Sequence, residues 1–360
     1  MSLDPTTSPV DPDAALWALA EGTAGLTGQA FLNATVERLA TLLDVAFVSI
    51  ARTNAWPATS TTVLACWYEG RLRGSFPYDL AETPCAVTLT GQVHFVPSGL
   101  LGLYPLARES RAESYLGIPL RDTDGSIMGH MAVFDTRPMS ACDRRLAVIR
   151  IFAMRAEAEL RRLILERQLV KLATTDALTG VANRRWFLDK AAREVERAHR
   201  HALPLSLLAL DLDRFKAIND VHGHATGDDV LRAMTACTQH LLRQTDVFGR
   251  LGGEEFAILL PHTDADGAVA TADRIHAAVR MLCIPVRGTA LRVTTSIGAA
   301  VLDPHDIGVE QLLHRADEAL YEAKRAGRNR TILADAPVRP SLRSAPVTPA
   351  AMDVSALPRA

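Results

Sequence analysis

The residues of this 360-residue chain that can do chemistry concentrate around two adjacent glycines, in the stretch 250–256, RLGGEEF. Runs at 246–248 and 257–260 flank the glycines and predict a β-hairpin with the glycines at its tip. Glycine at such a tip can take a positive φ and lets a bulky ligand approach the backbone. Glu254 and Glu255, directly after the tip, repel each other unless a cation lies between them.

A third carboxylate is expected beside this pair. The apolar run 205–210 predicts a buried strand that delivers Asp211 at its end. Paired in one sheet, this strand and the hairpin would bring Asp211 beside Glu254 and Glu255, and three hard oxygen ligands suit Mg²⁺ or Mn²⁺. The alternatives are a solvated hairpin edge for the glycine pair and a strand-end turn for Asp211 alone.

Four motifs in sequence order resemble those of the GGDEF family of diguanylate cyclases, here in a GGEEF variant. They are DALTG with NRR (176–180 and 183–185), DLDRFKAIND followed by two glycine-containing pairs (211–228), GGEEF (252–256), and ADEALYEAK with GRN (316–324 and 327–329). Any one of them is a weak signal, but their order and spacing over residues 174–333 make a strong one.

The resemblance implies condensation of two GTP molecules into cyclic di-GMP with loss of two pyrophosphates. It implies that Asp211 and Glu254, with the backbone carbonyl of Leu212, hold Mg²⁺ or Mn²⁺. Glu255 would join the metal site or help to take the proton of the attacking hydroxyl. The catalytic set is therefore Asp211, Glu254 and Glu255, and the choice of base between the two glutamates stays open.

The same resemblance assigns residues to the nucleotide. Asn219 and Asp228 would read the guanine edge, because an amide and a carboxylate match its donors and acceptor. Helix capping is the alternative for Asp228, which follows Gly227 and begins a predicted helix. The phosphates would be bound at a helix N-terminus and by cations, from Phe215, Lys216, Lys324 and Arg328. For Lys324 and Arg328 the alternative is compensation of a helix dipole.

An RxxD string precedes the hairpin, with Arg243 and Asp246 as its ends. The family carries its product-inhibition site at this position, so we expect cyclic di-GMP to bind here as an inhibitor. The alternative is an arginine at a helix C-terminus followed by an aspartate in a turn. Asp176 and Arg250 are expected to form a structural ion pair.

The N-terminal part, residues 14–138, resembles a GAF sensory domain. The hairpin at 113–134, joined at an Asp-Gly turn, and the segment 83–85 carry most of this likeness. Cys85 and His94 are the candidates for a ligand site. A lone cysteine is more often a small core residue, and His94 is expected to be solvent-facing or hydrogen-bonded, so the ligand of this domain is unknown.

A helix without Gly or Pro is predicted over residues 141–173. Its apolar positions alternate by three and four residues, which is typical of a parallel coiled coil between two chains. The positions are Leu146, Ile149, Ala153, Ala156, Leu160, Leu163, Arg167 and Val170. The alternative is an amphipathic helix that packs on its own domain.

These observations predict an α+β protein. We expect a flexible tail (1–13), a GAF-like antiparallel-sheet sensor (14–138), a coiled-coil linker helix (139–173), a palm-type GGDEF domain (174–335) and a disordered tail (336–360). In the GGDEF domain the mixed strands are expected to carry their helices on one face.

Charge and composition limit the partners. The chain has 39 Lys and Arg against 41 Asp and Glu, so it shows no basic footprint for nucleic acid or an anionic membrane. It contains no apolar run of the roughly 20 residues that a membrane span needs and no secretory signal. The five scattered cysteines indicate reduced thiols, so we expect a cytoplasmic protein.

A two-fold symmetric product made from two identical substrates requires two facing domains, which predicts a homodimer that is regulated through the GAF-like domain. A catalytically weak GGDEF domain that acts as a receptor for GTP or cyclic di-GMP is the competing hypothesis. The intact set of acidic residues favours the enzyme.

Overall fold

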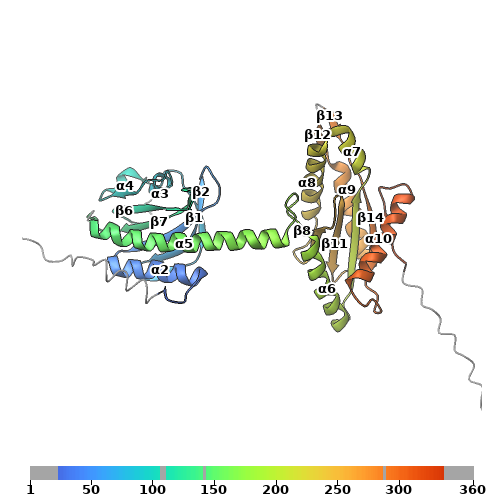
Figure 1. The fold of residues 1–360 in the computed structure, drawn as a ribbon, viewed down its shortest axis with the longest axis horizontal. Helices are drawn as coiled ribbons and strands as arrows, with labels where there is room; N and C mark the ends of the chain where they lie inside the picture. Colours follow the sequence, from blue (N-terminus) through green and yellow to red (C-terminus); the bar gives the residue numbers. More distant parts are fainter. Residues whose placement is uncertain (1–22, 106–110, 141–142, 287–288, 336–360) are drawn as a thin grey trace, which may run out of the picture. The chain divides into compact units, whose positions relative to one another are not determined.

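The computed structural model describes residues 23–105, 111–140, 143–286 and 289–335, which form two compact units (Figure 1). The division falls between Leu169 and Val170, inside the long helix α5 (Asp143–Thr174). Each unit contains its own β-sheet, so the expected combination of sheet and helix in both halves is confirmed. The predicted tails at 1–13 and 336–360 lie outside the described residues.

The first unit is built on an antiparallel sheet with the strand order β3-β2-β1-β7-β6-β5 and β4 beside β2. The predicted hairpin is confirmed, because β6 and β7 pair directly on either side of the Asp124-Gly125 turn. Gly125 has a φ of 85°, which glycine adopts without steric cost. The strands are β1 (Phe47–Thr53), β2 (Ser60–Tyr68), β3 (Arg71–Arg73), β4 (Phe76–Asp79), β5 (His94–Val96), β6 (Ser114–Arg121) and β7 (Ile127–Asp135).

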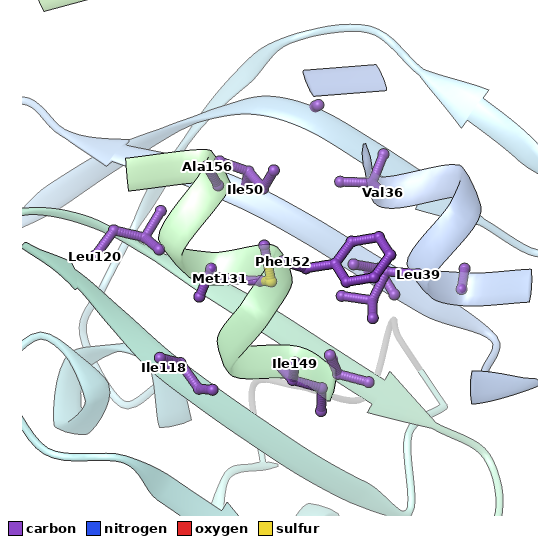
Figure 2. Close-up of a cluster of buried hydrophobic side chains, with 14 of the residues drawn as sticks. Val36, Leu39, Ile50, Ile118, Leu120, Met131, Ile149, Phe152 and Ala156 are labelled. Carbon is purple, nitrogen blue, oxygen red and sulfur yellow. The ribbon is translucent and has the colours of Figure 1, made fainter. Parts of the chain in front are cut away.

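Helices cover both faces of this sheet (Figure 1). On one face, α2 (Gly28–Leu43) and α5 enclose the main core of the unit, in which the side chain of Phe152 of α5 points toward Leu39 of α2 (Figure 2). On the other face, the short helices α3 (Pro84–Thr88) and α4 (Leu100–Leu103) cover a second cluster around Tyr115.

The long helix α5 uses its heptad positions differently from the prediction. Ile149, Ala153, Ala156 and Leu160 are at most 3% exposed, because they pack on α2 and the sheet of their own chain. The predicted seam between two chains is therefore wrong over this stretch, and the alternative of a helix packed on its own domain holds there. A residue already buried within its own chain cannot be the knob of an intermolecular coil.

The opposite face of α5 is apolar and exposed towards its C-terminal end. Leu165, Leu169 and Leu172 are 51%, 68% and 72% exposed, and their spacing of four and three residues places them on one side of the helix. Met154 is also exposed and lies on the same side of the helix, about three turns before Leu165. We call Leu165, Leu169 and Leu172 the leucine stripe.

The second unit is built on a six-stranded mixed sheet with the order β15-β14-β9-β11-β10-β8. The predicted strand β9 lies in the middle of this order and is buried along its whole length. The segment 289–301 contains two strands in different sheets, because β13 forms a separate hairpin with β12 whereas β14 pairs with β9. The strands are β8 (Ala182–Asn183), β9 (Leu205–Leu212), β10 (Val247–Arg250), β11 (Glu255–Pro261), β12 (Ile284–Val286), β13 (Thr289–Leu291), β14 (Thr295–Val301) and β15 (Thr331–Leu333).

The helices of the second unit cover both faces of its sheet, so the prediction that they lie on one face is wrong. Leu208 and Leu210 of β9 belong to a core with residues of three helices, α7 (Phe215–His222), α8 (His224–Gln239) and α9 (Ala265–Met281). Leu207 and Ala209 point to the opposite face, into a core with residues of α6 (Arg184–His201) and α10 (Val309–Arg325).

Gly298 of β14 sets how closely α10 approaches the sheet. A Cβ at this position would clash with the carbonyl oxygen of Ala316 and the amide nitrogen of Leu320, both in the backbone of α10. Because glycine has no side chain, the helix can pack directly on the strand. This contact carries Lys324, in the last turn of α10, to the end of the neighbouring strand β9.

Within the ranges that the structure describes, no helix is both long enough and apolar enough to span a lipid bilayer.

Candidate active site

The predicted carboxylates meet at the C-terminal end of β9. Asp211 and Glu255 are direct partners in the antiparallel pairing of β9 with β11, and Glu254 immediately precedes β11. Cβ atoms of such cross-strand partners lie about 4.5–5.5 Å apart, on the same face of the sheet. Asp211 is 5% exposed, Glu254 is half-buried and Glu255 is exposed, so the group runs from the core of the unit to its surface.

The two glycines of the hairpin do not act as predicted. Neither Gly252 nor Gly253 has a positive φ, so the expectation of a left-handed tip is wrong. A Cβ on Gly252 would instead lie 2.7 Å from the carboxylate oxygen Oε2 of Glu255. Glycine at this position therefore leaves room for the Glu255 carboxylate.

Arg250 holds the tip of the hairpin in place. Its guanidinium donates to the carbonyl oxygens of Gly252 (3.1 Å) and Gly253 (2.6 Å), and it pairs with Asp176 at 3.0 Å. The predicted structural ion pair is confirmed. Burial opposes ionisation of Asp176, but hydrogen bonds from Thr179 and Arg250 outweigh it and hold the pKa of Asp176 below its ordinary value.

Lys324 forms an ion pair with Asp211, with its Nζ atom 2.7 Å from Oδ2 of the carboxylate. The sequence analysis placed Lys324 among the phosphate contacts and did not predict its ion pair with Asp211. The side chain of Lys324 is about one-third exposed, whereas the carboxylate of Asp211 is buried. The alternative that Lys324 only offsets the dipole of α10 does not account for this ion pair.

Negative charge exceeds positive charge in this group. Burial raises the pKa of Asp211, and Glu255 and Asp213 raise it further against the opposing effect of Lys324. Burial also raises the pKa of Glu254, followed by the charge of Asp211. Three carboxylates around one lysine are therefore short of a cation.

The donors of this group fit a small divalent cation. Two carboxylates, from Asp211 and Glu254, and the backbone carbonyl of Leu212 are the hard oxygen ligands that Mg²⁺ and Mn²⁺ prefer. Across the described ranges, no three or more His, Cys, Asp or Glu side chains converge as a metal-binding cluster. The predicted ligand set contains only two side chains and does not require such a cluster.

Asp213 supports the site and was missed by the sequence reasoning. Its carboxylate is buried and accepts hydrogen bonds from Ser296 (2.6 Å), Thr294 (2.7 Å) and the backbone N–H of Asn329 (3.0 Å). It thereby ties the end of β9 to β14 and to the segment that follows α10. The available signal was the i, i+2 spacing of Asp211 and Asp213, which places both on one face.

Asn219 and Asp228 lie on consecutive helices, α7 and α8. The helix α8 begins at His224, four residues before the predicted start, so Asp228 lies one turn inside it and the capping alternative is wrong. Gly227 allows Asn219 to pack against α8, because a Cβ there would clash with the Oδ1 atom of Asn219. That buried oxygen has no hydrogen-bond partner among the described residues.

The predicted phosphate contacts are spread around the start of α7 and the end of α10. Phe215, the first residue of α7, is buried, whereas Lys216 and Arg328 are exposed. Arg328 lines a cavity of about 420 Å³ together with Arg214 and Arg292. Sequence reasoning assigned no role to these two arginines: Arg214 lies within the motif 211–220, and Arg292 lies outside the motifs.

Arg243 and Asp246 line the wall of a larger cavity of about 840 Å³. The helix α8 ends at Gln239, so Arg243 is not the helix-terminal arginine of the alternative. The other part of the alternative, an aspartate in a turn, is present: the backbone N–H of Arg243 donates to Oδ2 of Asp246 at 2.8 Å. Oδ1 of Asp246 is buried without a partner in the described part of the chain, and Lys190 and Arg197 of α6 also line the cavity.

The two candidate residues of the first unit have partners within the protein. Cys85 is buried and accepts a hydrogen bond from the hydroxyl of Tyr115 at 3.6 Å, and burial raises the pKa of its thiol. Nε2 of His94 lies 2.9 Å from the hydroxyl of Tyr104, as expected for a hydrogen-bonded histidine. Neither residue identifies a ligand for this unit.

Comparison with known proteins gives matches for both units. Residues 173–330 match the family model described as "Diguanylate cyclase, GGDEF domain", and residues 27–160 match the model of the GAF domain. The probable diguanylate cyclase DgcC of Escherichia coli is 41% identical over 170 residues, which are 47% of this chain and 45% of that protein. The diguanylate cyclase DgcP of Pseudomonas aeruginosa is 40% identical over 181 residues, 50% of this chain and 27% of that protein.

This chain therefore spans less than half the length of these two relatives. Among solved structures, the coiled coil and GGDEF domain of DgcB from Caulobacter crescentus, in complex with c-di-GMP, is 35% identical with a TM-score of 0.48. That match covers 52% of this chain and 98% of the DgcB chain.

The raised pKa of Glu254 leads to a prediction about stability. A carboxyl whose pKa is higher in the folded than in the unfolded state lowers stability as the pH rises between these two values. Glu254→Gln removes this penalty and should raise the melting temperature of the second unit by about 1–3 °C at pH 8. Near pH 4 the carboxyl is largely protonated in both states, so the variant should show a clearly smaller gain there.

Differential scanning calorimetry at pH 8 and pH 4 measures this effect. Glu322→Gln, which removes an exposed glutamate of α10, is the matched control and should leave both melting temperatures unchanged. An equal or lower melting temperature of Glu254→Gln at pH 8 would show that the carboxylate group carries no excess charge.

Proposed function

We propose that this chain, which belongs to the GGDEF family and carries a GAF domain ahead of its GGDEF domain, condenses two GTP molecules into cyclic di-GMP and two pyrophosphates. The observation that carries the proposal is the grouping of Asp211, Glu254, Glu255 and Lys324 at one end of the sheet. Relatives that are named diguanylate cyclases, at about 40% identity, support it.

In this proposal Asp211, Glu254 and the carbonyl of Leu212 would hold Mg²⁺ or Mn²⁺. The bound ion would lower the pKa of the attacking 3′-hydroxyl and neutralise charge on the triphosphate. Lys324, already on Asp211, is within reach of a phosphate bound at the open side of the site. Glu255, exposed beside Asp211, would join the metal site or help to accept the proton.

The guanine base would lie between α7 and α8. The buried Oδ1 atom of Asn219 has no partner among the described residues, and leaving such an acceptor unpaired costs about 1–3 kcal/mol. A guanine N–H group would satisfy it, and Asp228 would accept from the remaining donors of the same edge. The backbone at Phe215, with Lys216 and Arg328, would bind the outer phosphates.

The symmetry of the product requires two active sites to face each other, and we propose that the chain acts as a homodimer. In this proposal the leucine stripe forms the dimer interface, in place of the coiled-coil seam that the sequence predicted. It is exposed, it has heptad spacing, and it lies on the face of α5 opposite the one that packs on its own chain. A short seam of this kind gives a weak dimer, which ligand binding to the GAF domain can shift.

We also propose that cyclic di-GMP inhibits the enzyme by binding at Arg243 and Asp246. The cavity of about 840 Å³ is large enough for a dinucleotide. Arg243 suits phosphate, whereas Lys190 and Arg197 pair with Glu194, which also lines the cavity. The unpartnered Oδ1 of Asp246 can accept from a guanine N–H. The proposed compartment is the cytoplasm, where GTP is available and where free thiols such as Cys66 and Cys237 stay reduced.

The enzyme proposal is tested by product analysis. The purified full-length chain, incubated with GTP and Mg²⁺, should release cyclic di-GMP and pyrophosphate, quantified by liquid chromatography. Asp211→Asn should reduce turnover by about 10²–10³-fold or more, because it removes a charged ligand of the proposed metal ion, and that ion would offset the negative charge of the transition state. Asp229→Asn, which removes an exposed carboxylate next to Asp228, should retain the normal rate.

Two results would contradict the proposal that this chain is an active diguanylate cyclase. One is turnover at the normal rate in the double variant Asp211→Ala, Glu254→Ala. The other is a wild-type chain that binds GTP or cyclic di-GMP without forming product, which is the behaviour of a receptor.

The inhibitory site is tested with Arg243→Ala. This variant should raise the concentration of cyclic di-GMP needed for half-inhibition at least about tenfold, the effect of losing one charge-assisted contact. The initial rate without product should not change, because Arg243 lies outside the carboxylate group. Arg200→Ala, an exposed arginine of α6 that does not line the cavity, is the control. Unchanged product inhibition in Arg243→Ala would refute the site.

The dimer is tested with Leu169→Arg. A charge in the leucine stripe should weaken association at least about tenfold, measured by analytical ultracentrifugation, and turnover at low protein concentration should fall in parallel. Gln168→Arg adds the same charge one residue away, outside the leucine stripe, and should have a smaller effect. If Leu169→Arg dimerises as well as the wild type, the leucine stripe is not the interface.

A further inference from the structure

A small cavity lies between α5 and the sheet of the first unit, near the end of the packed part of the helix. It has a volume of about 170 Å³ and is lined by residues of α2, β1, β2 and α5, among them Leu32, Arg52, Leu160 and Arg167. This is several times the volume of a water molecule in the liquid, about 30 Å³. It is smaller than the roughly 300–1,000 Å³ of sites for larger organic ligands.

The cavity carries positive charge without a counter-charge. Its lining contains the guanidinium groups of Arg52 and Arg167 and no carboxylate. Neither arginine forms an ion pair or a side-chain hydrogen bond within the described ranges, and the Nε atom of Arg52 is buried. Two other arginines of α5, Arg161 and Arg162, do pair with acidic residues.

The two arginines are close enough to affect each other. Burial lowers the pKa of Arg52, and the charge of Arg167 lowers it further. An unpaired buried N–H group and the repulsion between like charges both cost free energy. One bound anion would remove both costs.

We propose that this cavity binds a compact oxyanion, a phosphate or a small carboxylate, between Arg52 and Arg167. Guanidinium groups donate in a planar fork that matches two oxygens of one anion, so a pair of them is suited to this ligand class. The volume admits such an ion and excludes a nucleotide. The site is independent of the cyclase chemistry proposed for the second unit.

The position of the site gives its occupancy a structural consequence. Arg52 belongs to β1, and Arg167 belongs to α5 beyond the fully buried positions that end at Leu160. An anion between them ties this part of the helix to the sheet. Arg167 lies between Leu165 and Leu169 in sequence, on the opposite side of the helix. An anion bound to both Arg52 and Arg167 would therefore order the helix segment that carries the leucine stripe.

Hydrogen exchange of the full-length chain, followed by mass spectrometry, tests the site locally. Phosphate at 20 mM should slow amide exchange in peptides that cover residues 160–169 at least about threefold, compared with sodium chloride at equal ionic strength. Acetate forms a second arm, which distinguishes a carboxylate from a phosphate ligand. Arg52→Gln and Arg167→Gln should abolish the effect, and Arg150→Gln, an exposed arginine of α5 outside the cavity, should retain it.

The proposal is overturned if neither anion slows exchange in the wild type, or if both glutamine variants respond like the wild type. Arg167→Glu gives an independent test, because it supplies a carboxylate to Arg52 from the chain itself. In a buffer free of oxyanions this variant should raise the melting temperature of the first unit by about 1–3 °C and lose the response to anions. A lower melting temperature would show that the two side chains do not meet across the cavity.

Discussion

The second unit depends on the pairing of β9 with β11. Every residue of β9 is buried, so its hydrogen bonds and its register with β11 are determined by two apolar cores at once. That register makes Asp211 the partner of Glu255 and leaves no freedom to separate them. A slip of one residue would turn the apolar side chains of β9 to the wrong faces. The carboxylates are therefore held together by the hydrophobic cores, against their mutual repulsion.

The charge at this sheet edge shows how the surrounding structure accommodates an unfavourable group. Lys324 reaches Asp211 because Gly298 lets α10 lie directly on β14. Asp213 is satisfied by Ser296, Thr294 and the backbone of Asn329, so it needs no cation. The remaining imbalance falls on Asp211 and Glu254, because burial raises the pKa of both carboxyl groups. Such an imbalance is expected of a site that is completed by a metal ion and a nucleotide.

The helix α5 combines two roles on two faces. One face, from Ile149 to Leu160, is part of the core of the first unit, and the opposite face is apolar and exposed in the leucine stripe. Arg167 occupies the first face after the fully buried stretch ends, where an arginine lines a cavity instead of filling it. This arrangement links the packing of the GAF domain with the helix segment proposed to contact a second chain.

The local patterns of the sequence determined most elements and predicted which carboxylates meet at the end of β9. The hairpins around 124–125 and 252–253, the buried strand ending at Asp211 and the long helix α5 follow from alternation, turn residues and helical periodicity. Only the tertiary structure decided which partner each surface meets. A heptad pattern is the same whether its partner is the helix's own domain or another chain, so Ile149 and Leu160 were assigned to the wrong neighbour. The charge balance of Asp211, the unpartnered oxygen of Asn219 and the meeting of Arg52 with Arg167 join segments far apart in sequence. Their distances and burial depend on long-range packing, which no local pattern contains.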